Sequence, residues 1–159
     1  MAITMKIEGL AALGEQLTQL GEKAGSVASM GLYDGAGIMA QEINNGANSI
    51  RTGPGASRTD ARYATPEEKA IVVAAGAGIA KFNKNGSEVQ TSIGFRNSGY
   101  AQLNGKTVPV PKIVNSINSG TSFMHKQPFV RKAAVVGAKK AEAAITKTIE
   151  EKFNEIIKK

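Results

Sequence analysis

Two helical patterns of apolar residues occupy the first fifty positions. The first is a stripe of leucines at steps of three and four, Leu10, Leu13, Leu17 and Leu20. The second stripe runs through Leu32, Ala36, Met39, Ile43 and Ala47. Such spacing places apolar side chains on one face of an α-helix. Because Gly21 and Gly25 fall between the stripes and glycine disfavours helix, the pattern predicts two N-terminal helices.

Three glycines inside the second stripe allow two interpretations. Gly31, Gly35 and Gly37 would each cost a helix interior up to about 1 kcal/mol. They indicate either a close approach by another backbone or a break in the helix.

Residues 51–64 lack an apolar period and are rich in Gly, Pro, Ser and Asp, so they predict a long loop. The sequence Thr65-Pro66-Glu67-Glu68 then predicts a helix start. Thr65 can cap it, Pro66 suits the first helical position and Glu68 completes a capping box.

A hairpin is expected next. Ile79–Phe82 and Val89–Phe95 flank Asn83-Lys84-Asn85-Gly86, and Asn-Gly suits the positive φ angles of a tight turn. Val89, Thr91, Ile93 and Phe95 would share the buried face of the second strand.

The last third of the chain predicts a second long loop, 97–111, and a short apolar piece around Ile113, Val114 and Ile117 that Gly120 ends. A long terminal helix follows. Its apolar positions recur at steps of three and four: Ala134, Ala138, Ala141, Ile145, Ile149, Phe153 and Ile156. The expected fold is therefore α+β, one domain over 1–159. It has two N-terminal helices, a small antiparallel sheet and a C-terminal helix packed on the sheet.

Charge is distributed unevenly along the chain. The net charge is +7, yet residues 1–50 carry two lysines and five acids, whereas residues 51–132 carry twelve basic and four acidic residues. This excess is typical of a chain with a polyanionic or acidic partner. The chain has no cysteine, which suits assembly in a reducing cytoplasm. The N-terminus has no long apolar run, so we expect no membrane anchor.

Catalytic chemistry is not indicated. His125 is the single histidine, and Glu67 and Glu68 point about 100° apart on a helix, so they do not form an acid/base pair. We therefore expect no enzyme, no catalytic, cofactor-binding or metal-binding residues, and no cofactor. A basic nucleic-acid-binding module stays open as an alternative.

The C-terminal half resembles a known family. Gly120-Thr121, then Pro128-Phe129-Val130-Arg131 and an alanine-rich helix, are similar to the siphophage tail-component family. This is the family of gene product ten of Hong Kong-97-type phages, akin in role to the tail-completion protein of lambda. The leucine stripe, the second helix and Thr52-Gly53 occur in the family's order.

The resemblance implies a structural virion protein. Its subunits would form a homo-oligomeric ring, six-fold in siphophages, at the head–tail junction or tail end. The ring would be assembled in the host cytoplasm, would contact other neck and tail proteins and would let DNA pass. A tail terminator or a head-completion connector protein is the alternative in the same class.

The long loop at residues 51–64, which we call the basic loop, and the terminal helix supply the expected contact residues. Arg51, Arg58 and Arg62 would reach neighbouring subunits or partners. Arg131 opposes the dipole of its helix and should have a carboxylate partner, within the chain or on a neighbour. Pro128 would set the entry of the last helix. Phe129 would anchor that helix to the sheet by burying a side chain worth roughly 1.5–3 kcal/mol.

Overall fold

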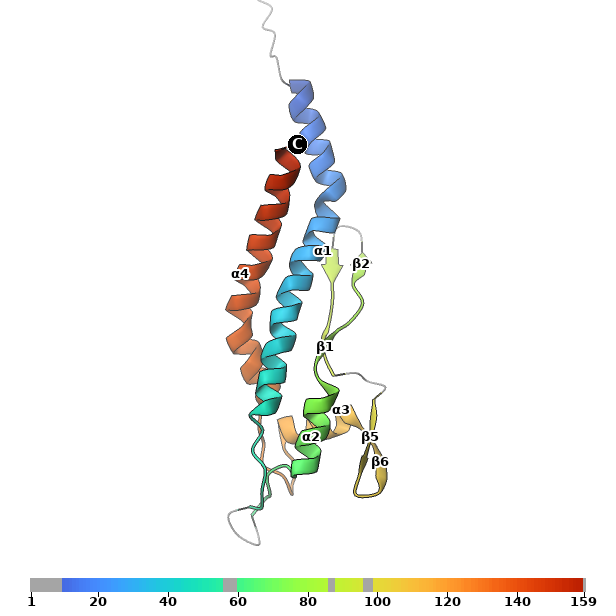
Figure 1. The fold of residues 1–159 in the computed structure, drawn as a ribbon, viewed down its shortest axis with the longest axis vertical. Coiled ribbons are helices and arrows are strands. Elements are labelled where there is room, and N and C mark those ends of the chain that lie inside the picture. The colour runs from blue at the N-terminus through green and yellow to red at the C-terminus, as the bar shows by residue number, and fades with distance from the viewer. Residues whose placement is uncertain (1–9, 56–59, 86–87, 96–98, 159) are drawn as a thin grey trace, which may run out of the picture.

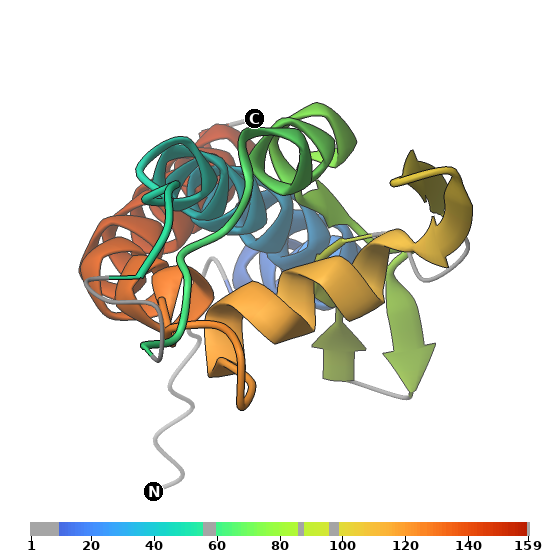
Figure 2. The ribbon, with the colours of Figure 1, turned by 90° about the horizontal axis from the view of Figure 1, so that it is seen from below.

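The computed structural model describes residues 10–55, 60–85, 88–95 and 99–158. Two long helices, α1 (Leu10–Asn48) and α4 (Phe129–Ile157), lie side by side in opposite directions and form a stalk (Figure 1). The two shorter helices and the last two strands gather around one end of the stalk, seen from below in Figure 2, whereas the first four strands run alongside α1 (Figure 1). We call this end the base. The fold class is α+β, as the sequence predicts.

α1 is one continuous helix of 39 residues, so the prediction of two N-terminal helices is wrong in this detail. Neither Gly21 nor Gly25 has the positive φ angle that ends a helix at glycine. Without such a stop, the loss of helix propensity at each glycine is small beside the packing along a long amphipathic helix.

Glycines bring the two stalk helices close together. A Cβ atom added to Gly35 would lie 2.5 Å from Cγ1 of Ile145, and one added to Gly31 would lie 2.9 Å from Cγ1 of Ile149. The predicted close approach is therefore confirmed at these two positions. Gly37 has nothing within 4 Å, so the prediction is wrong there.

The long C-terminal helix is confirmed, but it packs mainly on α1 rather than on a sheet (Figure 1). The short antiparallel pairs offer a narrow face, whereas α1 offers a stripe along the whole helix. Ala141 is buried as expected. Nearer the start of α4 the buried positions are Ala133 and Gly137, one residue before the predicted Ala134 and Ala138.

The second N-terminal stripe forms the inner face of α1. Ala36, Ile43 and Ala47 are buried, with exposed fractions of 2%, 4% and 1%. At the base Ile43 and Ala47 join a cluster supplied by every helix of the described chain, including Val72 of α2 and Ile117 of α3. Among the described residues, no helix combines the length and apolar character needed to span a membrane.

Helix α2 (Pro66–Ala75) starts as predicted. The Thr65 hydroxyl accepts a hydrogen bond from the backbone N–H of Glu68 at 3.1 Å, and the Glu68 carboxylate accepts one from the N–H of Thr65 at 2.7 Å. This reciprocal pair is a complete capping box.

The predicted antiparallel pairing is present as two short pairs. Asn83–Asn85, which were expected in the turn, instead form a strand, because the ladder continues as far as the pairing of Asn85 with Glu88. β1 (Gly78–Ile79) pairs with β4 (Ile93–Gly94), and β2 (Asn83–Asn85) pairs with β3 (Glu88–Gln90). The register brings Asn85 opposite Glu88, while Gly86 of the expected turn lies outside the described residues. The predicted buried face of the second strand is half-buried, and Gln90 and Ser92 on the other face are exposed.

The prediction of a loop at 97–111 is wrong. This stretch contains a further hairpin, β5 (Tyr100–Leu103) and β6 (Lys106–Pro109), and the first residues of α3 (Val110–Ser119). Asn104 and Gly105 join the strands with φ angles of 51° and 73°, as a tight hairpin turn requires. The Asn-Gly signal was in the sequence, but the polar strands beside it lack the alternation that identifies strands.

Candidate subunit interface

A tight turn links α3 to the segment before α4. Gly120 ends α3 with a φ angle of 77°, and a Cβ atom there would lie 3.0 Å from the backbone nitrogen of Lys126. Thr121 and Met124 exchange two backbone hydrogen bonds, of 3.0 and 3.2 Å. The Thr121 hydroxyl also accepts from the N–H of Phe123 at 3.2 Å. The Gly-Thr pair therefore forms a rigid turn, which we call the Phe123 turn (residues 120–124).

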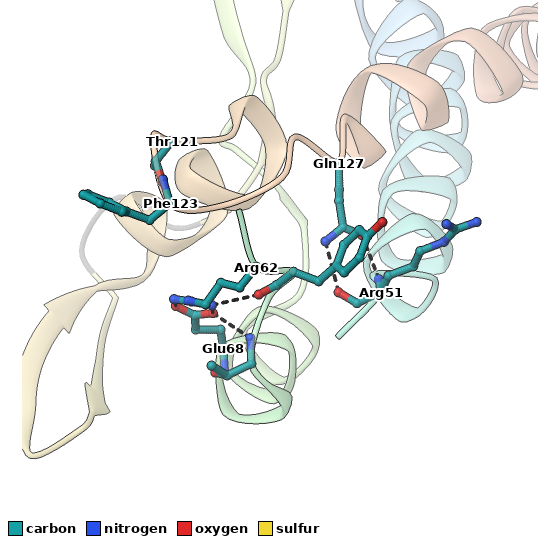
Figure 3. A network of polar contacts seen from close by, with 8 residues as sticks. Arg51, Arg62, Glu68, Thr121, Phe123 and Gln127 are labelled. Carbon is teal, nitrogen blue, oxygen red and sulfur yellow. Dashed lines mark hydrogen bonds and ion pairs between the residues drawn. The ribbon is translucent and has the colours of Figure 1, made fainter. Parts of the chain in front are cut away.

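The end of the basic loop holds this turn in place. The N–H of Arg62 donates to the carbonyl of Phe123 at 2.9 Å, and the N–H of His125 donates to the carbonyl of Arg62 at 2.8 Å. Met124 points into the core with 5% exposed, whereas the side chain of Phe123 is 80% exposed. Figure 3 shows Phe123 pointing away from the neighbouring segments.

Gln127 connects the end of α1 to the start of α4. Its side-chain oxygen accepts from the N–H of Arg51 at 2.7 Å, and its side-chain nitrogen donates to the carbonyl of Arg51 at 3.0 Å (Figure 3). Pro128 directly precedes α4, as predicted. Phe129 is 5% exposed and meets Phe95 edge-on, with ring centroids 6.1 Å apart. This ring contact ties α4 to the chain after β4.

Arg62 forms an ion pair inside the subunit. Its guanidinium donates to both carboxylate oxygens of Glu68 at 2.7 and 2.8 Å, and to the carbonyl of Tyr63 at 2.9 Å. The Glu68 side chain is 8% exposed and the Arg62 side chain 40%. The hydrogen bond from Arg62, with further ones from Thr65, holds the pKa of Glu68 below its ordinary value, although burial opposes this shift.

The four expected contact residues thus differ in their surroundings. Arg62 is paired with Glu68 within the chain, and its contact with a neighbour or partner stays a prediction. Arg51 is exposed, although its backbone N–H and carbonyl are hydrogen-bonded to the side chain of Gln127. Arg131 is exposed, and its side chain forms no hydrogen bond or ion pair with any described residue, so a carboxylate on a neighbour stays a prediction. Arg58 lies outside the described residues.

A cavity of about 560 Å³ lies between the end of α1, the segment from His125 and the first turns of α4. We call it the basic groove. Ile50, Phe129 and Val136 supply apolar lining, and Arg51, Lys126 and Lys132 supply positive charge. Glu42, its one acidic lining residue, accepts a hydrogen bond from Lys140 at 2.7 Å. The groove therefore suits an acidic or anionic partner.

His125 packs within the base rather than standing alone on a loop. Its ring lies 4.9 Å from that of Tyr63, centroid to centroid, and its Nε2 is 3.3 Å from Oδ2 of Asp60. Within the part of the chain that the structure describes, no three His, Cys, Asp or Glu side chains gather as a metal site would require.

A second hollow lies halfway along the stalk. Its volume is about 320 Å³, and it is lined by Ser26, Ser29, Met30, Tyr33, Asp34 and Phe82. The rings of Tyr33 and Phe82 are 6.2 Å apart, centroid to centroid. We call this hollow the aromatic slot. The slot lies between α1 and the chain just before β2.

Comparisons with known protein families, with curated proteins and with solved structures find no match for this chain.

Sequence reasoning missed three features of this surface: the Arg62–Glu68 pair, the Gln127 bridge and the aromatic slot. The capping box identified Glu68, but nothing local shows that an arginine six residues earlier returns to it. Gln127 and Arg51 are 76 positions apart, and Tyr33 and Phe82 belong to different elements. Each feature depends on contacts that only the folded chain creates.

Proposed function

We propose that this chain is a structural subunit of a tailed bacteriophage, a ring-forming tail-completion or head–tail joining component of the neck. The proposal starts from the resemblance of Gly120-Thr121 and Pro128-Phe129-Val130-Arg131 to the siphophage tail-component family. The observation that carries it is that these residues fold as one connected unit. The Phe123 turn, the Gln127 bridge and the start of α4 follow one another at the junction of stalk and base.

The distribution of exposed apolar side chains supports a subunit that is covered by neighbours. Tyr100 is 68% exposed, Phe123 80% and Val135 73%. They belong to β5, the Phe123 turn and α4, so exposed apolar side chains occur on three separate elements. Aromatic residues are enriched at protein interfaces, and a ring subunit needs at least two such contact surfaces.

Removing the gene from its phage tests the proposal. Electron microscopy should show full heads beside free tails, and supplying the wild-type chain should restore joined particles. Overlong tails would identify a tail terminator instead. Normal, infectious particles without the protein would refute the structural role.

Complementation with charge variants tests whether the basic groove takes part. Arg51→Glu combined with Lys132→Glu reverses two exposed groove charges, so the chain should fold but fail to restore joining. A matched control is Lys139→Glu with Lys147→Glu, two exposed charges further along α4. If the groove variant restores joining as well as the control does, the groove is not a contact surface.

A nucleic-acid-binding module is the second candidate, and the three cations of the groove favour it. If each meets one phosphate of duplex DNA, the logarithm of the affinity should fall with the logarithm of salt with a slope of roughly −3. The Arg51→Glu, Lys132→Glu variant should flatten that slope. A slope near zero for the wild-type chain would exclude this function.

A further inference from the structure

The Phe123 turn presents an aromatic ring that its own chain leaves uncovered. Two backbone hydrogen bonds between Thr121 and Met124 close the turn, and a third, from the N–H of Arg62 to the carbonyl of Phe123, holds it to the neighbouring segment. An anchor fixed in this way loses little conformational freedom when it binds. Burying a phenylalanine ring is worth roughly 1.5–3 kcal/mol, and this ring, 80% exposed, still has most of that to gain.

The aromatic slot has the chemistry to receive such a ring. Met30 and Tyr33 are 48% and 57% exposed, so apolar surface at the slot is uncovered as well. Tyr33 and Phe82 offer ring faces and edges, and Met30 offers a thioether that packs well against aromatic rings. At about 320 Å³ the slot falls at the small end of the range for binding clefts, roughly 300–1,000 Å³. It would hold one side chain rather than a large ligand.

The slot of the same subunit is out of reach. Tyr33 lies 15 residues before the end of α1 at Asn48, which corresponds to about 22 Å along the helix axis. Phe123 is held at the base, because the N–H of Arg62 donates to its carbonyl and the next residue, Met124, belongs to the core cluster there. A rigid turn cannot span this distance, so only another molecule can bring the ring and the slot together.

Charge favours a second copy as that molecule. The α1 wall of the slot, Ser26–Asp34, carries Asp34 as its only charged residue, while Lys126 follows the Phe123 turn and is exposed. Seating the turn on the α1 side of another copy therefore brings opposite charges together.

We infer that Phe123 of one subunit inserts into the aromatic slot, Met30–Tyr33–Phe82, of the next copy of this chain. Because the ring and the slot lie at different places on one subunit, the contact is head-to-tail, and such contacts close into rings when the rotation allows it. The inference supplies the proposed ring with its repeating contact. Only the closure into a ring rests on the proposed function, because the contact itself can be measured on purified protein.

Single cysteines test the contact directly, because the chain has none of its own. Ser122 is exposed beside Phe123, and Ser26 is exposed at the slot. A chain with Ser122→Cys is mixed with a chain with Ser26→Cys and treated with a short bismaleimide crosslinker. We expect a covalent pair that contains one chain of each kind. Adding Phe123→Ala to the Ser122→Cys chain should abolish it.

Two controls separate this contact from others. Ser49→Cys labels the basic groove, where Ser49 is also exposed, and should give little product with Ser122→Cys. Phe123→Ala and Tyr33→Ala should each weaken self-association at least tenfold by sedimentation, the equivalent of about 1.4 kcal/mol. Unchanged circular dichroism would show that both variants fold.

Crosslinking at Ser49→Cys instead of Ser26→Cys would overturn the inference, as would product that Phe123→Ala leaves unchanged. Either result leaves the proposed function standing if gene deletion still gives unjoined heads and tails. Particles that assemble normally without the protein would refute the proposed function and would not alter the crosslinking result.

Discussion

The Arg62–Glu68 pair gives a sharp prediction about stability. Glu68→Ala removes a carboxylate that accepts two hydrogen bonds from Arg62 and one from the N–H of Thr65. Hydrogen bonds to a charged group are worth about 1.5–3 kcal/mol, and half of a capping box contributes about 1 kcal/mol. Because the Arg62 side chain is 40% exposed, water can replace part of the hydrogen bonding that its guanidinium loses in Glu68→Ala. We expect a loss of about 2–3 kcal/mol in the free energy of unfolding.

Glu67→Ala is the matched control for this measurement. Glu67 stands one position earlier in the same first turn of α2, but its side chain is exposed. Substitutions at such positions usually change stability by less than about 0.5 kcal/mol. Urea unfolding followed by circular dichroism compares the two variants with the wild-type chain. If Glu68→Ala unfolds at the same urea concentration as Glu67→Ala, the pair does not stabilise the base.

Because Arg62 is paired with Glu68, Arg62 is a poor position at which to test whether the basic loop binds a partner. An Arg62→Glu substitution would place a carboxylate against Glu68, so it would destabilise the subunit as well as alter its surface. A reversal of Arg58 and Arg62 together therefore does not report on partner binding alone. Arg51, whose side chain is exposed, is the better position for that test.

Three further outcomes follow from the structure. Folding lowers the pKa of Glu68. Its contribution to the free energy of unfolding should therefore be full above the unfolded pKa of about 4.3 and be lost as the pH falls through the lower folded pKa. In acid, the urea midpoint of the wild-type chain should converge with that of Glu68→Ala. Phe129→Ala should cost about 3–5 kcal/mol in urea unfolding, whereas Val135→Ala, 73% exposed, should cost little. Gly35→Ala should destabilise the fold by about 1 kcal/mol or more, because the added methyl group crowds Ile145. Gly37→Ala should stabilise the fold by up to about 1 kcal/mol, because alanine favours helix. Equal effects at the two glycines in thermal melts would contradict the close helix contact.

Local signals account for the parts of the fold that were predicted correctly. The capping box at Thr65, the glycine that ends α3 and the apolar period of α4 each act within one or two turns of chain. Their physical causes are hydrogen bonding to neighbouring backbone groups, allowed φ angles and side-chain periodicity. These causes operate whatever the rest of the molecule does, so they can be read from sequence.

Tertiary structure decided what those signals leave open. Gly21 and Gly25 looked like a helix boundary, yet α1 continues because no competing element stops it. The C-terminal stripe was expected to pack on a sheet, but α1 covers it instead, because glycines at positions 31 and 35 let the two backbones approach. The Gln127 bridge and the aromatic slot join residues far apart in the chain, and the Arg62–Glu68 pair joins the end of a loop to the helix that follows it. Such contacts depend on how elements pack, and packing is a property of the whole fold.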